Sequence, residues 1–159
     1  MKSESSLTVS SAPRVGNLIG GVLGMLEGFP TSILQLLLRL GIASVFFKSG
    51  LVKIESWQST VFLFKMEYKV PVIPYEAAAY MSAAVELATP VLLVLGLATR
   101  LATLPLLGMT VVIEIFVFPE SWSEHLIWAA ILLVLLCRGP GQISLDRLVG
   151  PWFKERLGI

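Results

Sequence analysis

Four apolar segments follow one another along the chain, at residues 32–54, 75–97, 101–118 and 122–137. A helix needs about 20 residues to cross the hydrocarbon core of a bilayer, a length that all but the short last segment reach or approach. In lipid every backbone polar group must be bonded within the protein, so these runs favour helices. The pattern predicts an all-α integral membrane protein built as a four-helix bundle.

Two further segments place apolar residues at helical spacing beside a polar face. Between residues 13 and 29 the apolar positions recur every three or four residues, and residues 55–74 carry Trp57, Phe64 and Tyr68 in the same way. Both segments predict short amphipathic helices that lie in the membrane interface. A loosely ordered leader is the alternative interpretation for the first of them.

These segments divide the chain into three parts. Residues 1–30 form a polar, serine-rich tail and the first interfacial helix, residues 31–150 form the four-helix domain, and residues 151–159 form a C-terminal tail. Near the end of the domain, Ser144 and Asp146 follow the pattern of a helix N-cap and first turn. One more short helix is therefore predicted there.

Ionisable side chains interrupt the apolar segments at Arg39, Lys48, Lys53, Glu86, Glu114 and His125. An ionised group at mid-depth of a bilayer is costly, so each marks either a functional site or a buried structural pair. Arg39, Gly50 and Lys53 fall on one helical face, which predicts that this face points into the bundle. Lys53 could instead extend to the interface from the end of its segment, and this second interpretation is favoured.

Depth along each helix predicts which of these groups meet. At 1.5 Å per residue, Arg39 lies roughly 10 Å and Glu86 roughly 16 Å from the cytoplasmic ends of their segments, so a buried Arg39–Glu86 pair is expected. Lys48 and Glu114 lie roughly 20–24 Å in, close to the start of the segment that carries His125, and predict a second cluster. Each set is either a structural clamp between helices or the wall of a pocket for a small lipophilic ligand such as a quinone, which needs hydrogen-bond donors and a proton source.

The composition supports a membrane location and excludes several classes of function. Of the 159 residues, 55% are hydrophobic and only 14% are charged, which is more apolar surface than a soluble globule of this size could bury. The formal net charge of +1 provides no basic stripe for nucleic acid. The single cysteine and single histidine exclude an internal disulfide, bis-histidine haem ligation and a Cys/His metal cluster, so no metal site is predicted.

The lysines and arginines are divided unevenly between the two ends of the predicted spans. With four spans both termini lie on one side, together with Lys2, Arg14, Arg100, Arg138, Arg147, Lys154 and Arg156. The opposite side carries Lys53, Lys65 and Lys69 around one long loop. Because cytoplasmic loops are enriched in Lys and Arg, both termini are predicted to be cytoplasmic.

Three blocks of sequence occur in order between the predicted spans: RLGIASVFFKSGLVK at 39–53, Glu86-Leu with GLATR at 96–100, and GPGQISLD at 139–146. Together they resemble the DoxX family of small four-helix membrane proteins, over residues 31–150. The resemblance implies a bundle in the bacterial cytoplasmic (inner) membrane, but it carries no defined catalytic signature. The positions that form its structural motif are Gly50, Gly96, Arg100, Gly139, Gly141 and Asp146.

The resemblance implies association with membrane oxidoreductases, including thiosulfate:quinone oxidoreductase. We therefore expect a membrane subunit that binds a quinone or similar lipophilic molecule between its helices, with the six ionisable residues named above as ligand-binding candidates. Catalytic residues are unknown, and the sequence leaves open whether the chain is itself an enzyme. The alternative is a non-catalytic module that assembles or stabilises a partner protein, with a small transporter in third place. The expected partners are the bilayer, an oxidoreductase or other membrane protein, and a further copy of the chain.

Overall fold

The computed structural model describes residues 12–150, with side chains from residue 16 onward. It divides into two units, residues 1–30 and 31–159, which are described separately. Helices make up most of the described chain and no strand occurs within residues 12–150, so the predicted all-α class is confirmed there. The predicted polar tail at 1–11 and the C-terminal tail at 151–159 lie outside the described residues.

The first unit contains one described helix, α1 (Ala12–Glu27), close to the helix predicted at residues 13–29. Its large apolar side chains are exposed, namely those of Leu18, Ile19, Val22, Leu23, Met25 and Leu26. An amphipathic helix with an uncovered apolar face is suited to a membrane interface. That location stays a prediction.

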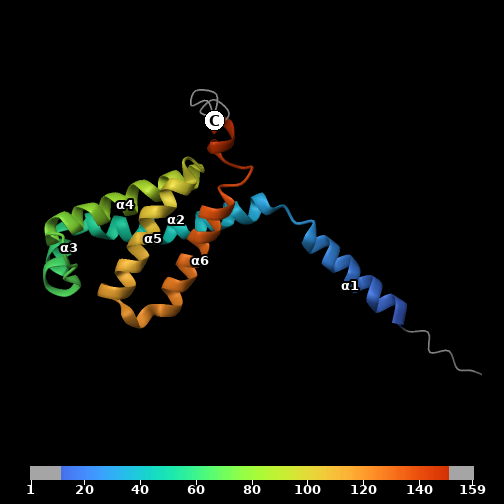
Figure 1. The fold of residues 1–159 in the computed structure, drawn as a ribbon, viewed down its shortest axis with the longest axis horizontal. Coiled ribbons are helices and arrows are strands. Elements are labelled where there is room, and N and C mark those ends of the chain that lie inside the picture. The colour runs from blue at the N-terminus through green and yellow to red at the C-terminus, as the bar shows by residue number, and fades with distance from the viewer. Residues whose placement is uncertain (1–11, 151–159) are drawn as a thin grey trace, which may run out of the picture. The chain divides into compact units, whose positions relative to one another are not determined.

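The helices of the second unit begin and end close to the predicted positions. They are α2 (Thr31–Glu55), α3 (Trp57–Leu63), α4 (Tyr75–Leu95), α5 (Thr99–Val112) and α6 (Trp122–Arg138). Three short turns join or extend them, the π-helical η1 (Phe64–Tyr68) and η2 (Ile113–Val117) and the 3-10 turn η3 (Pro119–Ser121). Residues 145–150 are also helical, as the N-cap pattern predicted. Figure 1 shows α2 and α4 side by side, with the hairpin of α5 and α6 packed against them.

The two π-helical turns are a departure from the regular helices that the sequence predicted. In η1 the N–H of Lys69 donates to the carbonyl of Phe64 at 3.3 Å, and in η2 the N–H of Phe118 donates to the carbonyl of Ile113 at 2.8 Å. Turns with this wider hydrogen-bond spacing are rare and frequently lie at functional sites. Both of these turns border the cavity described below.

Close packing of α2 on α4 depends on Gly50. A Cβ atom at this position would lie 2.9 Å from Cδ2 of Leu87 and 3.1 Å from Cβ of Glu86, so a larger residue would force the helices apart. The main buried apolar cluster consists of Ile42, Ala43, Phe46, Leu93, Ala102, Leu106, Leu132 and Leu135. Lipid gives helices no hydrophobic reason to associate, so close contacts of this kind and polar bonds hold such a bundle together.

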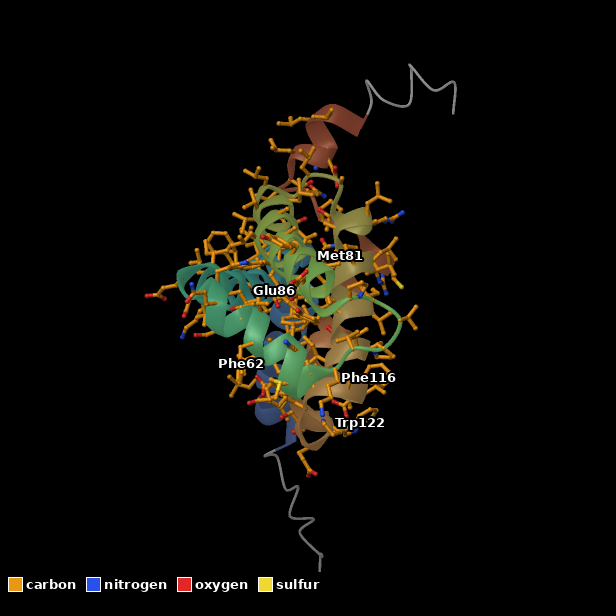
Figure 2. The ribbon with its side chains drawn as sticks, turned by 90° about the vertical axis from the view of Figure 1, so that its left-hand side faces the viewer. Phe62, Met81, Glu86, Phe116 and Trp122 are labelled. Atoms are coloured by element: carbon orange, nitrogen blue, oxygen red, sulfur yellow. The ribbon has the colours of Figure 1, made fainter. Side chains whose placement is uncertain are left out.

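The outer surface of the second unit carries many exposed apolar side chains. Figure 2 labels four on separate elements, Phe62, Met81, Phe116 and Trp122. The helical segments of the described range that are long and apolar enough to cross a membrane are Tyr75–Leu95, Thr99–Val117 and Pro119–Arg138, and a fourth is counted if α1 and α2 form one broken span. These features define a helical membrane protein, whereas the number of spans stays a prediction.

Candidate ligand-binding pocket

A cavity of about 600 Å³ lies between α2, α4, α5 and α6 and is bordered by both π-helical turns. Most of its wall is apolar, including Phe46, Met81, Met109, Val117 and Phe118. Its polar and ionisable lining residues are Ser49, Lys53, Tyr68, Ser82, Glu86, Ser121, Glu124 and His125. A mostly apolar cavity with a few polar groups is the usual form of a small-molecule site.

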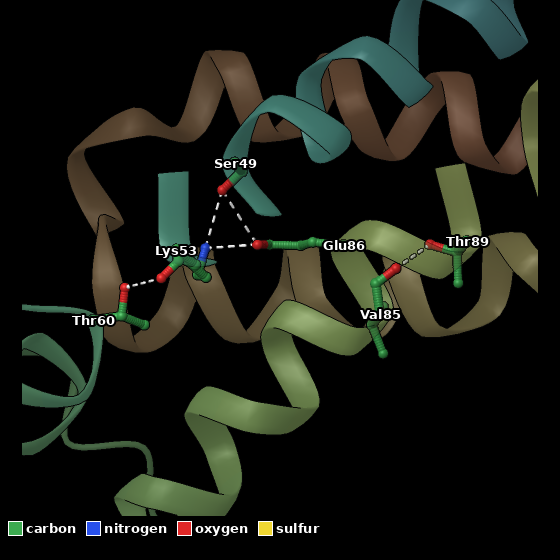
Figure 3. A network of polar contacts seen from close by, with 6 residues as sticks. All are labelled: Ser49, Lys53, Thr60, Val85, Glu86 and Thr89. Carbon is green, nitrogen blue, oxygen red and sulfur yellow. Dashed lines mark hydrogen bonds and ion pairs between the residues drawn. The ribbon is translucent and has the colours of Figure 1, made fainter. Parts of the chain in front are cut away.

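Glu86 forms an ion pair with Lys53 at this cavity (Figure 3). Nζ of Lys53 lies 2.7 Å from Oε2 of Glu86 and donates to its Oε1 at 2.8 Å. Ser49 completes a triangle, since its hydroxyl donates to Oε1 at 3.3 Å and accepts from Nζ at 3.0 Å. The Glu86 side chain is 1% exposed, whereas that of Lys53 is 17% exposed. The carboxylate is therefore compensated within the bundle by a lysine at the edge of the cavity.

Local helix geometry explains why these groups meet. Ser49 and Lys53 are four residues apart on α2, and Ser82 and Glu86 are four residues apart on α4, so each pair occupies one helical face. Gly50 allows α4 to approach closely at the level of Glu86. The hydroxyl of Thr60 donates to the carbonyl of Lys53 at 3.0 Å, which ties α3 to the last turn of α2.

A second polar contact joins His125 of α6, which lines the cavity, to Glu114 of η2, which is not among the lining residues. Nδ1 of His125 is 2.5 Å from Oε2 of Glu114, with side-chain exposures of 5% and 17%. The ring of Trp128 packs on His125 with centroids 4.9 Å apart and on Phe46 at 5.4 Å. The predicted contact between Glu114 and His125 is thus confirmed, and His125 and Trp128 face the same cavity as Glu86.

The predicted pairing of Arg39 with Glu86 is wrong. Arg39 is fully buried, but its guanidinium donates to the carbonyls of Leu93 at 3.1 Å and Val94 at 3.4 Å, and to that of Ile143. The depth count assumed that the cytoplasmic ends of the two segments, namely the start of α2 and the end of α4, lie at the same level. Instead Gly50 of α2 contacts Glu86, which places Arg39 eleven residues, roughly 16 Å, further along the helix. Arg39 donates to carbonyls in the last turn of α4, of which that of Leu93 also accepts from the N–H of Gly96 at 3.1 Å. Arg39 does not line the pocket.

The predictions for the two lysines of α2 also need correction. Lys53 turns toward α4 rather than away from the bundle, because Glu86 offers its ammonium group a buried partner. Lys48 is exposed and takes no part in the Glu114–His125 pair. Lys48 lies two residues beyond the buried Phe46, and two residues correspond to a rotation of about 200° around the helix axis. Its side chain is therefore on the opposite face of α2 from Phe46. Lys48 instead borders a smaller cavity of about 360 Å³ that shares Ser49, Lys53 and Tyr68 with the main one.

Three of the motif glycines, together with Asp146, shape the end of the bundle away from Lys53. Gly96 ends α4 in the left-handed region at φ +65, and Gly139 and Gly141 also have positive φ in the loop after α6. The carboxylate of Asp146 accepts from the backbone N–H groups of Ala98 at 2.6 Å and Thr99 at 3.0 Å, which caps the start of α5. Arg100 donates to the carbonyl of Cys137 at 3.4 Å. These residues have structural roles and lie outside the main pocket.

Sequence reasoning missed Ser49, Ser82 and Tyr68 as lining residues. For the two serines a signal was present, because each lies four residues before an ionisable residue on the same face. Tyr68 had been interpreted as an interfacial anchor, but it lies in η1 and borders both cavities. The sequence also indicated two separate clusters, whereas Glu86 and His125 line one cavity.

The fold and the pocket define a small helical membrane protein with a polar site between its helices. A family model described as DoxX matches residues 34–119, which is over half of the chain. The chain therefore belongs to the DoxX family, as its sequence blocks indicated. The matched region includes Lys53, Glu86 and Glu114 but not His125.

One relative among curated proteins is an uncharacterized protein of Haemophilus influenzae. It is 28% identical over 139 aligned residues, which cover 78% of this chain and 88% of the relative. No solved structure matches the chain significantly.

Proposed function

We propose that this protein binds a quinone, or a lipophilic molecule of similar chemistry, in the cavity between α2, α4, α5 and α6, as a membrane subunit associated with oxidoreductase activity. The observation that carries the proposal is a mostly apolar cavity of about 600 Å³ whose wall holds the Lys53–Glu86 ion pair in one part and His125 in another. Small-molecule sites typically measure about 300–1,000 Å³. The proposed link to an oxidoreductase rests on what the resemblance to the DoxX family implies.

The polar residues of the wall match the needs of a ligand with carbonyl oxygens. Lys53 has three N–H donors, and Ser49 and Ser82 contribute hydroxyl groups nearby. His125 places an imidazole ring on another part of the wall. Conversion of a quinone to a quinol requires two electrons and two protons. Glu86 and His125 are groups that can hold and pass protons, and electrons would come from a partner protein.

The proposed topology places four spans in the bacterial cytoplasmic membrane with both termini in the cytoplasm. Arg100, Arg138 and Arg147 gather at one end of the bundle, whereas Lys65 and Lys69 lie in the connection between α3 and α4. The excess of arginine at the first end favours the cytoplasm for that end. Cysteine labelling from either side of the membrane, at residues 67 and 142, tests this arrangement.

Ligand binding is tested with purified protein in detergent. Quinone is extracted and quantified after purification, and thermal unfolding is followed while ubiquinone or menaquinone is added. Ser82→Leu should fill the cavity and Glu86→Gln should remove the carboxylate, and both should reduce the ligand-induced shift. Glu76→Gln, an exposed change on the same helix, is the matched control and should behave as the parent. Absence of co-purified quinone together with no thermal shift would refute the proposal.

A second candidate is a non-catalytic module that stabilises a partner protein. The favouring observation is that Lys53 and Glu86 satisfy each other, which is also what a clamp between α2 and α4 requires. In that case no lipophilic ligand shifts the unfolding temperature, and a membrane protein co-purifies in a stoichiometric amount. Loss of this partner upon Glu86→Gln, with the bundle still folded, would support the second candidate.

A further inference from the structure

A third hollow, separate from the two cavities described above, lies at the start of α5 and the end of α6. Its volume is about 460 Å³, and its walls include Arg100, Arg138, Arg147 and the loop of residues 139–142. Arg100, Arg138 and Arg147, which come from three separate segments, thus line one open hollow. None of them contributes to the cavity around Glu86.

The positive charge of this hollow is largely uncompensated within the described part of the chain. All three arginines are exposed, and the guanidinium groups of Arg138 and Arg147 form no hydrogen bond or ion pair with residues 12–150. The one carboxylate in the wall belongs to Asp146, and its two oxygens accept from the backbone N–H groups of Ala98 and Thr99. The start of α5 adds the positive end of a helix dipole.

The hollow is built on a fixed loop. Gln35 donates to the carbonyl of Gly139 at 3.2 Å, and the N–H of Gln142 donates to the hydroxyl of Ser32 at 3.1 Å. The buried guanidinium of Arg39 joins the carbonyls of α4 to that of Ile143 in the same loop. These bonds hold the segment between Arg138 and Arg147 against α2. The two arginines are therefore attached to a backbone whose position is fixed by hydrogen bonds.

We propose that Arg100, Arg138 and Arg147 form a binding site for a phosphate group. A planar guanidinium matches the oxygens of a phosphate and donates two parallel hydrogen bonds to it. The hollow lies at the end of apolar helices, where lipid headgroups lie, and basic pockets between such helices bind anionic headgroups. The phosphate can belong to an anionic lipid or to a soluble anion, since both present the same oxygens.

The test uses the full-length protein in detergent, with bound molecules counted by native mass spectrometry. Phosphatidylglycerol, zwitterionic phosphatidylcholine and inorganic phosphate are titrated separately. Arg138→Gln/Arg147→Gln should weaken binding about 30-fold, since each basic side chain near an anionic headgroup contributes a factor of about five. Lys65→Gln/Lys69→Gln removes the same charge from the other end of the bundle and should leave the affinity unchanged. Asp146→Asn removes a negative charge from the wall and should strengthen binding.

The three titrations separate the sources of the phosphate. Preference for phosphatidylglycerol over phosphatidylcholine that depends on the arginine pair assigns a lipid headgroup. Saturation by inorganic phosphate with the same dependence, and without preference between the lipids, assigns a soluble phosphate. Binding that is equal in both double variants, or absent for all three molecules, overturns the proposal. Circular dichroism verifies that each variant retains its helices.

Discussion

Replacement of Lys53 by methionine should destabilise the bundle strongly, because it leaves a buried carboxylate without its partner. The Glu86 side chain is 1% exposed, and its other side-chain hydrogen bond comes from Ser49 at 3.3 Å. Removing one member of a buried ion pair typically costs about 3–5 kcal/mol. Lys53 is 17% exposed, so some water can reach the site, and the lower end of that range, about 3 kcal/mol, is expected.

A second substitution separates the lost partner from lost packing. Lys53→Met/Glu86→Met replaces both charges with apolar side chains of similar length and should recover most of the stability, to within about 1 kcal/mol of the parent. Lys48→Met is the matched control on the same helix. Its side chain is exposed, and the substitution should change the free energy of unfolding by less than about 0.5 kcal/mol.

The free energy of unfolding is measured by denaturation with sodium dodecyl sulfate from mixed micelles, followed by circular dichroism. The double variant must be more stable than Lys53→Met alone. If Lys53→Met costs no more than Lys48→Met, the carboxylate of Glu86 does not depend on Lys53. If the double variant is the less stable of the two, the charge explanation is wrong.

Three further predictions concern single positions. Gly50→Leu should destabilise the bundle by about 1–3 kcal/mol, because its Cβ would already meet Leu87 at 2.9 Å, and unfolding by detergent measures this. Asp146→Ala should cost about 1 kcal/mol through loss of the cap on α5 while Asp146→Asn costs less, in the same assay. Burial, and then the negative charges nearby, raise the pKa of the Tyr68 phenol above its ordinary value of 10.0. The folded state thus holds this proton more tightly than the unfolded chain, so stability should fall as pH rises past 10, and Tyr68→Phe should reduce that fall in a pH series.

The spacing of apolar residues was sufficient to predict where the helices lie, because each helix has its own apolar pattern in the sequence. The apolar runs located α2, α4, α5 and α6, and proline and glycine marked their ends. Even so, the widened turns at Phe64–Tyr68 and Ile113–Val117 left no trace in the spacing. A π-turn depends on what packs against the helix, which a local pattern does not contain.

The partners of the charged residues could not be predicted from depth alone, because pairing depends on how far one helix slides along another. Contact at Gly50 sets that offset between α2 and α4, and it brings Lys53 rather than Arg39 to Glu86. The angular position of Lys48 on α2 places it on the exposed face, so it does not join Glu114 and His125. Glu114 and His125 were paired correctly since only a short turn separates their helices, which leaves little freedom of offset.

Two cations of α2, the buried Arg39 and the partly exposed Lys53, show why a charge within an apolar helix does not by itself indicate a ligand site. Arg39 is bonded to carbonyls at the end of α4 and in the loop after α6, so all of its described bonds are used in holding the chain together. Lys53 is bonded to Glu86 and Ser49 but also borders the cavity, where its position is open to a bound molecule. A position in the cavity wall, rather than depth in the helix or charge, therefore distinguishes Lys53 as the candidate binding residue from the structural Arg39.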